Sequence, residues 1–133
     1  MTTGMNPAAG YRATQVNAAS PAERVVLLYE GALRFSRQSI AALERGDRPG
    51  AHAASVRAQE IVGELRATID LASGGEIASS LDALYDFVID RLLQGNIRRD
   101  AALTNEAIRV IEELIGAWRQ IAAGTPAPAP AGA

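Results

Sequence analysis

The sequence contains neither cysteine nor lysine, and only one histidine, His52, among its 133 residues. Without cysteine the chain cannot form a disulfide, a thiolate nucleophile or a cysteine-based metal site. This composition suits a reducing compartment without requiring one. All 13 basic residues are arginine. Together with the abundance of alanine, this indicates coding bias rather than selection for a particular site.

Charge and hydrophobic patterning exclude further classes. The net charge is -2 and the pI is about 5.4, so bulk charge favours neither nucleic acid nor a membrane surface as a partner. No stretch approaches the roughly 18 uninterrupted apolar residues that suggest a membrane-spanning helix. Residues 1–12, MTTGMNPAAGYR, hold no apolar segment, so we expect no signal peptide. These observations predict one soluble domain in the cytoplasm, without membrane insertion.

The two ends of the chain differ in composition from its middle. Residues 1–19 lack periodicity and contain Gly4, Pro7 and Gly10, which predicts a mobile N-terminal segment. Residues 123–133, AGTPAPAPAGA, are rich in proline and alanine, and proline cannot continue a helix, so we expect a disordered tail. The folded part is therefore predicted to be residues 20–122.

Apolar residues recur at spacings of three and four in four segments between these ends, which predicts four helices. The first begins at a capping box formed by Ser20 and Glu23, with Pro21 at its first position, and is expected to run to about Arg45. The others are predicted over residues 51–72, 76–94 and 100–122.

Short turns separate these segments, and no strand alternation occurs. Gly46, Asp47, Pro49 and Gly50 are expected in the first turn, residues 73–75 (SGG) in the second, and Gly95 with Asn96 at the end of the third helix. Consecutive helices joined so closely must be antiparallel neighbours. The predicted fold class is therefore all-α, an antiparallel up-down four-helix bundle.

Each predicted helix carries one apolar stripe, which we assign to the core. The stripe residues are Val25, Leu28, Tyr29, Ala32, Phe35, Ser36, Ile40 and Leu43; Ala54, Ala58, Ile61, Val62, Leu65, Ile69 and Ala72; Ile77, Leu81, Leu84, Tyr85, Val88 and Leu92; and Leu103, Ala107, Val110, Ile111, Leu114, Trp118 and Ile121.

Two helices carry more apolar residues than a bundle core requires, which is about three in seven. The first opens with residues 25–29, VVLLY, apolar on all sides. The fourth carries Ile108, Ile115 and Ala122 beside its main stripe, one heptad apart. Exposed apolar surface marks a partner site or an aggregation risk. The alternative is that Ile108 and Ile115 widen a tightly packed core.

No constellation typical of catalysis or metal binding is found. A di-iron bundle requires Glu-x-x-His pairs on two helices, but Pro49 precedes His52 by three residues. A phosphotransfer histidine would lie mid-helix near a basic residue, whereas His52 lies in the first turn, followed by Ser55 and Val56. The carboxylates are dispersed, and no glycine-rich phosphate loop follows a strand. We expect no enzyme, cofactor or metal.

Several short stretches together resemble the FliS family of flagellin export chaperones, over roughly residues 11–120. They are Tyr11, residues 15–17 (QVN), 19–21 (ASP), 28–32 (LYEGA), 74–78 (GGEIA), Leu81, 84–86 (LYD), 91–92 (RL), Asn96, Asp100 and 117–118 (AW). The chain departs from the family pattern at Ser80, Phe87 and Gly95, where asparagine, tyrosine and alanine are usual.

The resemblance implies a four-helix chaperone of the bacterial cytoplasm. Such a protein binds the disordered C-terminal segment of flagellin, which folds into helices on the chaperone surface. It keeps flagellin monomeric and helps deliver it to the flagellar export gate, without ATP, metal or catalysis. An alternative is a regulatory adaptor that uses the same bundle to bind a folded flagellar assembly or transcription regulator.

The candidate flagellin-binding residues combine the resemblance with the surplus apolar positions. They are Tyr11, Gln15, Val16, Val26, Leu27, Ile108 and Ile115. In the family, the N-terminal tyrosine region is associated with client binding, so Tyr11 and Val16 are predicted to cover an apolar groove when no client is bound. A hydrophobic staple is the simpler explanation for this segment, but it needs an apolar residue before Ser20, and Ala19 is a poor one.

Overall fold

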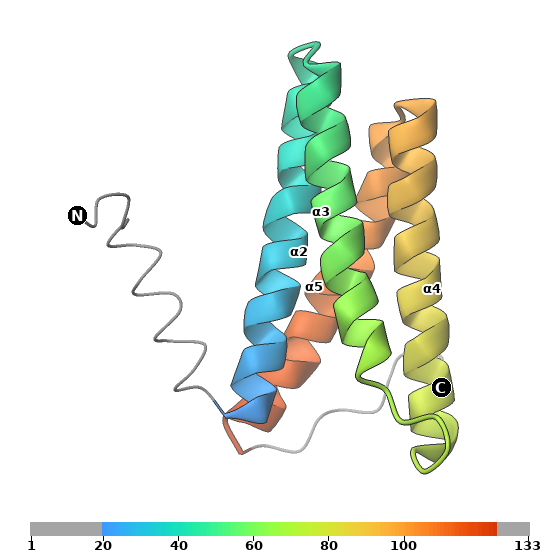
Figure 1. Cartoon of the computed structure of the whole chain (residues 1–133). Coiled ribbons are helices and arrows are strands. Elements are labelled where there is room, and N and C mark those ends of the chain that lie inside the picture. Colours follow the sequence, from blue (N-terminus) through green and yellow to red (C-terminus); the bar gives the residue numbers. More distant parts are fainter. Residues whose placement is uncertain (1–19, 125–133) are drawn as a thin grey trace, which may run out of the picture.

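A computed structural model of the chain describes residues 20–124. Within that range the chain forms four α-helices and no strand, namely α2 (Pro21–Glu44), α3 (Arg48–Ala67), α4 (Gly75–Arg98) and α5 (Ala101–Ala122). Each helix contacts the two beside it in a ring, and successive helices run in opposite directions (Figure 1). The predicted four-helix bundle is confirmed. None of these helices is long and apolar enough to cross a membrane.

The two predicted end segments fall almost entirely outside the described residues. Residues 1–19 are not described, and of residues 123–133 only Ala123 and Gly124 are. The predictions of a mobile N-terminal segment and a disordered tail therefore stay predictions.

The start of α2 follows the sequence prediction closely. Ser20 Oγ accepts a hydrogen bond from the backbone N–H of Glu23 at 3.2 Å, and the Glu23 carboxylate accepts one from the Ser20 N–H at 3.1 Å. These bonds lower the pKa of Glu23. The first turn agrees with the prediction in part: Gly46 lies at φ +76°, and Asp47 accepts the Gly50 N–H at 2.9 Å to cap α3. Helix α3 nevertheless begins at Arg48, three residues before the predicted Ala51, so Pro49 and Gly50 belong to its first turn and not to the loop.

Helix α3 ends at Ala67, not at the predicted Ala72. Two short polar side chains form hydrogen bonds with backbone groups here and so compete with the hydrogen bonds that would continue the helix. Thr68 Oγ donates to the carbonyl three residues earlier at 2.7 Å. The Asp70 carboxylate accepts the backbone N–H groups of Ala72 and Ser73 at 3.1 and 3.2 Å. The apolar period continues past the point where these bonds end the helix.

The predicted end of the third helix at Gly95 and Asn96 was also wrong. Helix α4 passes through both residues and ends at Arg98. Arg99, at φ 53°, takes the left-handed conformation that a terminal glycine was expected to supply. Gly95 is buried against α5, where an added Cβ would overlap Thr104 Oγ1. This glycine therefore allows a close helix approach and does not terminate α4.

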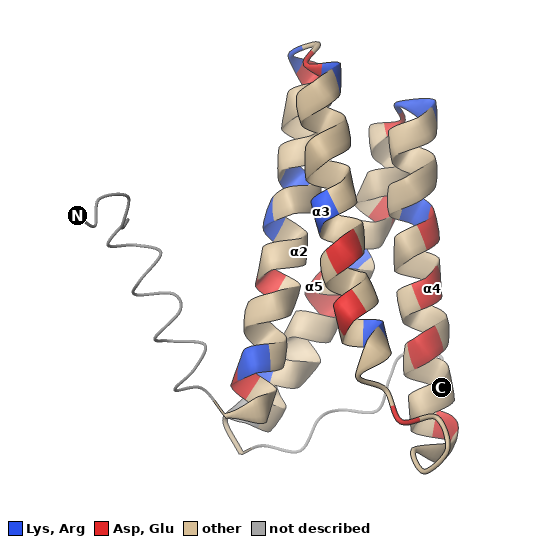
Figure 2. Cartoon of the chain, in the orientation of Figure 1, with Lys and Arg blue, Asp and Glu red and all other residues tan. Residues whose placement is uncertain are grey.

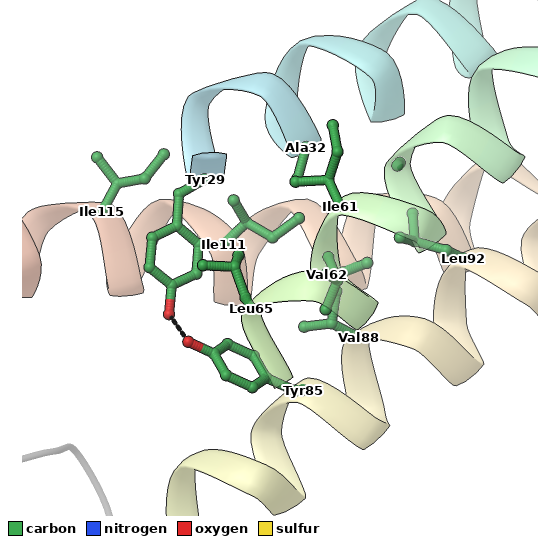
Figure 3. Close-up of a cluster of buried hydrophobic side chains, with 12 residues drawn as sticks. Tyr29, Ala32, Ile61, Val62, Leu65, Tyr85, Val88, Leu92, Ile111 and Ile115 are labelled. Carbon is green, nitrogen blue, oxygen red and sulfur yellow. Dashed lines mark hydrogen bonds between the residues drawn. The ribbon is translucent and has the colours of Figure 1, made fainter. Parts of the chain in front are cut away.

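The core is one apolar cluster drawn from all four helices (Figure 3). Its buried members are Tyr29, Ala32, Ala58, Ile61, Val62, Leu65, Tyr85, Val88, Leu92, Ala107, Ile111 and Ile115. The hydroxyls of Tyr29 and Tyr85 form a hydrogen bond across its centre, between α2 and α4. Burial is the main cause that raises the pKa of both tyrosines.

Three residues assigned to the core stripe are exposed instead, all near one end of the bundle. Ile77 is 82% exposed, and Ala72 and Ile121 are exposed as well. Ala72 lies in the loop between α3 and α4. Ile77 lies in the first turn of α4, where α3 has already ended, and Ile121 lies in the last turn of α5. Periodicity places these residues on the correct face, but no neighbouring helix extends far enough to cover them.

Candidate helix-binding groove between α2 and α3

The structure describes four of the seven predicted client-binding residues. Tyr11, Gln15 and Val16 lie outside the described residues. Val26 is buried, whereas Leu27, one residue further along α2, is partly exposed and lines an open hollow between α2 and α3. Of the four described candidates, only Leu27 lies in a hollow that a partner could enter.

Ile108 and Ile115 on α5 are 7% and 4% exposed. Ile115 belongs to the central cluster with Tyr29 and Ile111. Their burial supports the alternative explanation of the sequence pattern, a widened core. Neither isoleucine supplies free apolar surface in the described part of the chain, and an aspartate at either position would test folding before it tested client binding.

The hollow that contains Leu27 measures 780 Å³ and lies between the antiparallel helices α2 and α3. Its apolar lining is Leu27, Leu28, Gly31, Phe35, Ile61, Gly63 and Ala67. Charged side chains from both helices complete it, namely Arg34, Arg57, Glu60 and Glu64. Its lining therefore combines apolar side chains with charged groups of both signs.

A second hollow of 370 Å³ continues along the same two helices. It shares Phe35 and Arg57 with the first hollow and is otherwise lined mainly by small residues, namely Ala41, Ala42, Gly50, Ala53 and Ala54. We call the two together the α2–α3 groove. On α2 it extends from Leu27 to Arg45, which is about 27 Å at the helical rise of 1.5 Å per residue.

Phe35 lies where the two hollows meet. The guanidinium carbons of Arg34 and Arg57 lie 5.2 and 5.4 Å from its ring centroid. Arg57 also donates to Glu60 at 3.3 Å. Cation–π contacts of this kind at exposed sites are worth about 0.5–1 kcal/mol. These arginine side chains can therefore move aside or pair with carboxylates of a bound partner at modest cost.

The groove owes its depth to residues without large side chains. An added Cβ at Gly63 would meet nothing within 4 Å, and one at Gly31 would make only ordinary contact with Ile61 Cδ1 at 3.4 Å. Gly63 in the middle of α3 is therefore not required by the bundle itself. Its empty position instead keeps the groove open.

Ion pairs hold the other three seams of the bundle. Arg37 joins α2 to Glu112 of α5 at 2.8 Å, and Arg91 of α4 lies 3.9 Å from Glu106 of α5. On the seam between α3 and α4, Arg66 bonds Asp82 at 2.8 Å, which lowers the pKa of that carboxyl. The first and last of these pairs tie α2 to α5 and α3 to α4, on the sides of α2 and α3 away from the groove, and partly exposed pairs of this kind contribute modestly, about 0–1 kcal/mol each.

Comparison with known proteins identifies the family of this bundle. The family model for "Flagellar protein FliS" matches residues 4–125. The chain belongs to the FliS family.

Three relatives named flagellar secretion chaperone FliS show how far the likeness extends. That of Salmonella typhimurium is 37% identical over 80% of this chain and 79% of its own. That of Vibrio cholerae is 35% identical over 81% of this chain and 79% of its own. That of Bacillus subtilis is 33% identical over 86% and 85%. FliS similarity thus covers the whole described bundle.

Replacing Gly63 with alanine is expected to stabilise this FliS bundle by about 0.5–1 kcal/mol, because alanine loses less backbone entropy in a helix interior and meets no neighbour here. Gly116 on α5 offers a matched control, since an added Cβ there also meets nothing within 4 Å. Urea unfolding followed by circular dichroism should give similar gains for both variants. A loss of stability at Gly63 alone would show that the bundle needs that glycine.

Sequence reasoning missed most of this groove. Phe35 and Ala54 were assigned to the core stripes, and Ala41, Gly50 and Ala53, which also line the groove, formed no apolar pattern. A usable signal was present in the pair of mid-helix glycines, Gly31 and Gly63, because glycine weakens a helix interior and usually has a reason to be there.

Proposed function

We propose that this FliS-family protein is a flagellar export chaperone of the cytosol that binds the disordered C-terminal segment of flagellin. It prevents premature polymerisation of flagellin and assists its delivery to the flagellar type III export apparatus. Binding alone performs this task, without catalysis or a cofactor. The observation that carries the proposal is the α2–α3 groove, found on a bundle that belongs to the FliS family.

The groove matches the chemistry of such a client. The terminal segment of flagellin assembles into a helical filament core, so it forms amphipathic helices. An amphipathic helix docks through apolar side chains at positions i, i+3, i+4 and i+7, which need a long, narrow, apolar trough. The α2–α3 groove is about 27 Å long, the length of roughly five helical turns, and Phe35 lies near its middle. The charged residues at its edge can pair with the polar side of the client helix.

Coupled folding explains how such binding remains reversible. A disordered segment that folds on binding typically buries about 1,000–3,000 Å² and loses several kcal/mol of the interaction energy to ordering. The complex can therefore be specific and still release its client. A delivery chaperone needs this combination, because it must hand flagellin on at the export gate.

The N-terminal residues Tyr11, Gln15 and Val16 are proposed to act at the same groove, covering it in the free chaperone and yielding to the client. The groove begins at Leu27, seven residues after Ser20, so the preceding segment enters the bundle near one end of it. A loop of about ten residues closes with little entropic penalty. Equal hydrogen exchange over residues 11–19 with and without client, together with unchanged client affinity of a Tyr11→Ala variant, would refute this role.

The direct test is titration with a peptide from the C-terminus of the host's own flagellin. We expect saturable binding, with a gain of helical signal at 222 nm beyond the sum of the two components. A peptide of the same composition in shuffled order is the control, since it keeps charge and hydropathy and loses the helical spacing. A flagellin peptide that neither binds nor gains helicity would refute the chaperone function and favour the adaptor that binds a folded regulator.

A further inference from the structure

A separate pocket of 340 Å³ lies at the end of the bundle that carries the α2–α3 and α4–α5 turns, the upper end in Figure 1. All four helices contribute to its lining. We call it the turn-end pocket. It lies inside the ring of helices, between the α2–α3 pair and the α4–α5 pair, and opens to the surface.

The pocket exists because the buried positions at this end carry small side chains. Buried Ser39 and Ser55 line it, as do Gly95 and Thr104. Hydrogen bonds join α3 to α4 here: Ser55 Oγ donates to the Leu92 carbonyl at 3.3 Å. The large apolar cluster lies further down the bundle, so the space at this end stays partly unfilled.

Apolar walls surround this space. Ile40 and Leu43 of α2, both assigned to the core by periodicity, reach the pocket and remain partly exposed. Leu93 and Ile97 of α4, one helical turn apart, complete the walls and are 39% and 63% exposed. These two large apolar side chains expose apolar surface to solvent, and an apolar partner would cover it.

The charged residues that line the pocket are both basic. They are Arg48 and Arg99; His52 lines the pocket beside them, and no carboxylate does. His52 Nδ1 lies 3.0 Å from Asn96 Nδ2, while within residues 20–124 neither Arg48 nor Arg99 makes an ion pair with a carboxylate. Figure 2 shows basic segments at both turns of this end, each next to an acidic segment. The N-termini of α3 and α5 lie here as well and add positive partial charge, which the caps formed by two aspartates reduce.

The turn-end pocket and the α2–α3 groove lie on different faces of the same helices. On α2, the pocket is lined by Ser39, Ile40 and Leu43, and the groove by Phe35, Gln38, Ala41 and Ala42. With 3.6 residues per turn, these two sets point on average to different sides of the helix. A partner in the pocket and a client in the groove would therefore not collide.

We propose that the turn-end pocket is a second docking site, which receives branched apolar side chains flanked by carboxylates from a partner protein other than the client. The apolar walls would contact the partner's branched apolar side chains, and Arg48 and Arg99 would pair with the carboxylates that flank them. Charge complementarity sets this chemistry, since acidic flanks would meet two free guanidinium groups and no opposing carboxylate in the lining. The proposal is independent of what occupies the groove.

The test uses the full-length chain, labelled with ¹⁵N, and three capped hexapeptides. The first, acetyl-AELLEA-amide, has leucines flanked by acid; acetyl-AQLLQA-amide removes the charge, and acetyl-AEAAEA-amide removes the anchors. We expect saturable amide shifts at Leu93, Ile97 and His52 with the first peptide, and affinities lower by at least about fivefold with the other two. No saturable shift at millimolar peptide, equal affinity for all three, or shifts confined to the groove would each overturn the proposal.

Single substitutions test whether the peptide binds at the residues that line the pocket. Arg48→Gln and Ile97→Gln, both at exposed positions, should each weaken binding of acetyl-AELLEA-amide by at least about fivefold. Arg109→Gln and Leu71→Gln are matched exposed controls that do not line the pocket and should leave affinity unchanged. A dimer in sedimentation that Ile97→Gln abolishes, without peptide binding, would show instead that a second copy of the chain covers the pocket.

Discussion

Above pH 10 the free energy of unfolding is expected to fall by as much as about 2.7 kcal/mol per pH unit, twice the 1.36 kcal/mol that one titrating group contributes. The two groups are Tyr29 and Tyr85, buried in the core and hydrogen-bonded to each other. Desolvation is the largest cause that raises the pKa of each hydroxyl, because it penalises the phenolate.

The direction follows from the two states. In the unfolded chain each tyrosine ionises near pH 10. In the folded bundle the raised pKa keeps both hydroxyls protonated at that pH. The contribution of the pair is therefore complete below about pH 10 and is lost as the pH rises from there toward the folded-state pKa values.

The composition of the chain leaves few other groups to interfere with this measurement. With no lysine and no cysteine, tyrosine is the only side-chain type that titrates between about pH 9 and 12. The chain holds three tyrosines, of which Tyr11 lies outside the described residues. Urea unfolding measured by circular dichroism from pH 8 to 11 should thus report mainly the buried pair.

Two kinds of variant separate the pKa effect from general fragility at high pH. The double variant Tyr29→Phe/Tyr85→Phe removes both hydroxyls and should unfold with little pH dependence above pH 9. Tyr29→Phe leaves the Tyr85 hydroxyl without its partner, which costs about 1–3 kcal/mol at neutral pH, whereas Tyr85→Phe leaves the Tyr29 hydroxyl bonded to Trp118 and should cost less. A double variant with the same alkaline slope as the parent chain would refute the assignment to these tyrosines.

Helix caps were predictable from sequence because short-range contacts create them. The Ser20–Glu23 capping box and the Asp47 cap involve residues three apart, and both are present in the structure. The start of α3 was still predicted three residues late, because Pro49 and Gly50 were assigned to the turn and instead lie in the first helical turn after Asp47. Helix ends were less predictable, since Asp70 stops α3 by capturing backbone amides, although the apolar period continues. Gly95 was misassigned as a stop because its function depends on contact with α5, which the local sequence does not show.

The candidate site was predictable only in part for a related reason. Periodicity identifies the apolar face of a helix, but it does not show whether a neighbour will cover that face. Ile108 and Leu27 both looked like surplus apolar residues, yet the bundle buries Ile108 and leaves Leu27 at the edge of the groove. The groove itself depends on small residues, such as Gly63, whose contribution is the space they leave.

The space at Gly63 can be filled directly by a larger side chain. Replacing Gly63 with leucine should weaken binding of the flagellin C-terminal peptide by at least about tenfold, or 1.4 kcal/mol, because a branched side chain would stand in the hollow that the client helix is proposed to occupy. The same replacement at Gly116 is the matched control. That site is exposed, has equal room for a side chain and lies on α5, so affinity should not change.

Fluorescence anisotropy of a labelled flagellin peptide would give both affinities, and urea unfolding would verify that both variants remain folded. Equal losses at the two positions would point to a general effect on the bundle and remove the support that the groove gives to client binding. No loss at either position, with the parent chain still binding the peptide, would leave a flagellin chaperone whose client site lies elsewhere. A selective loss at Gly63 would place the client helix between α2 and α3, because the two variants add the same side chain and only the one at Gly63 enters the groove.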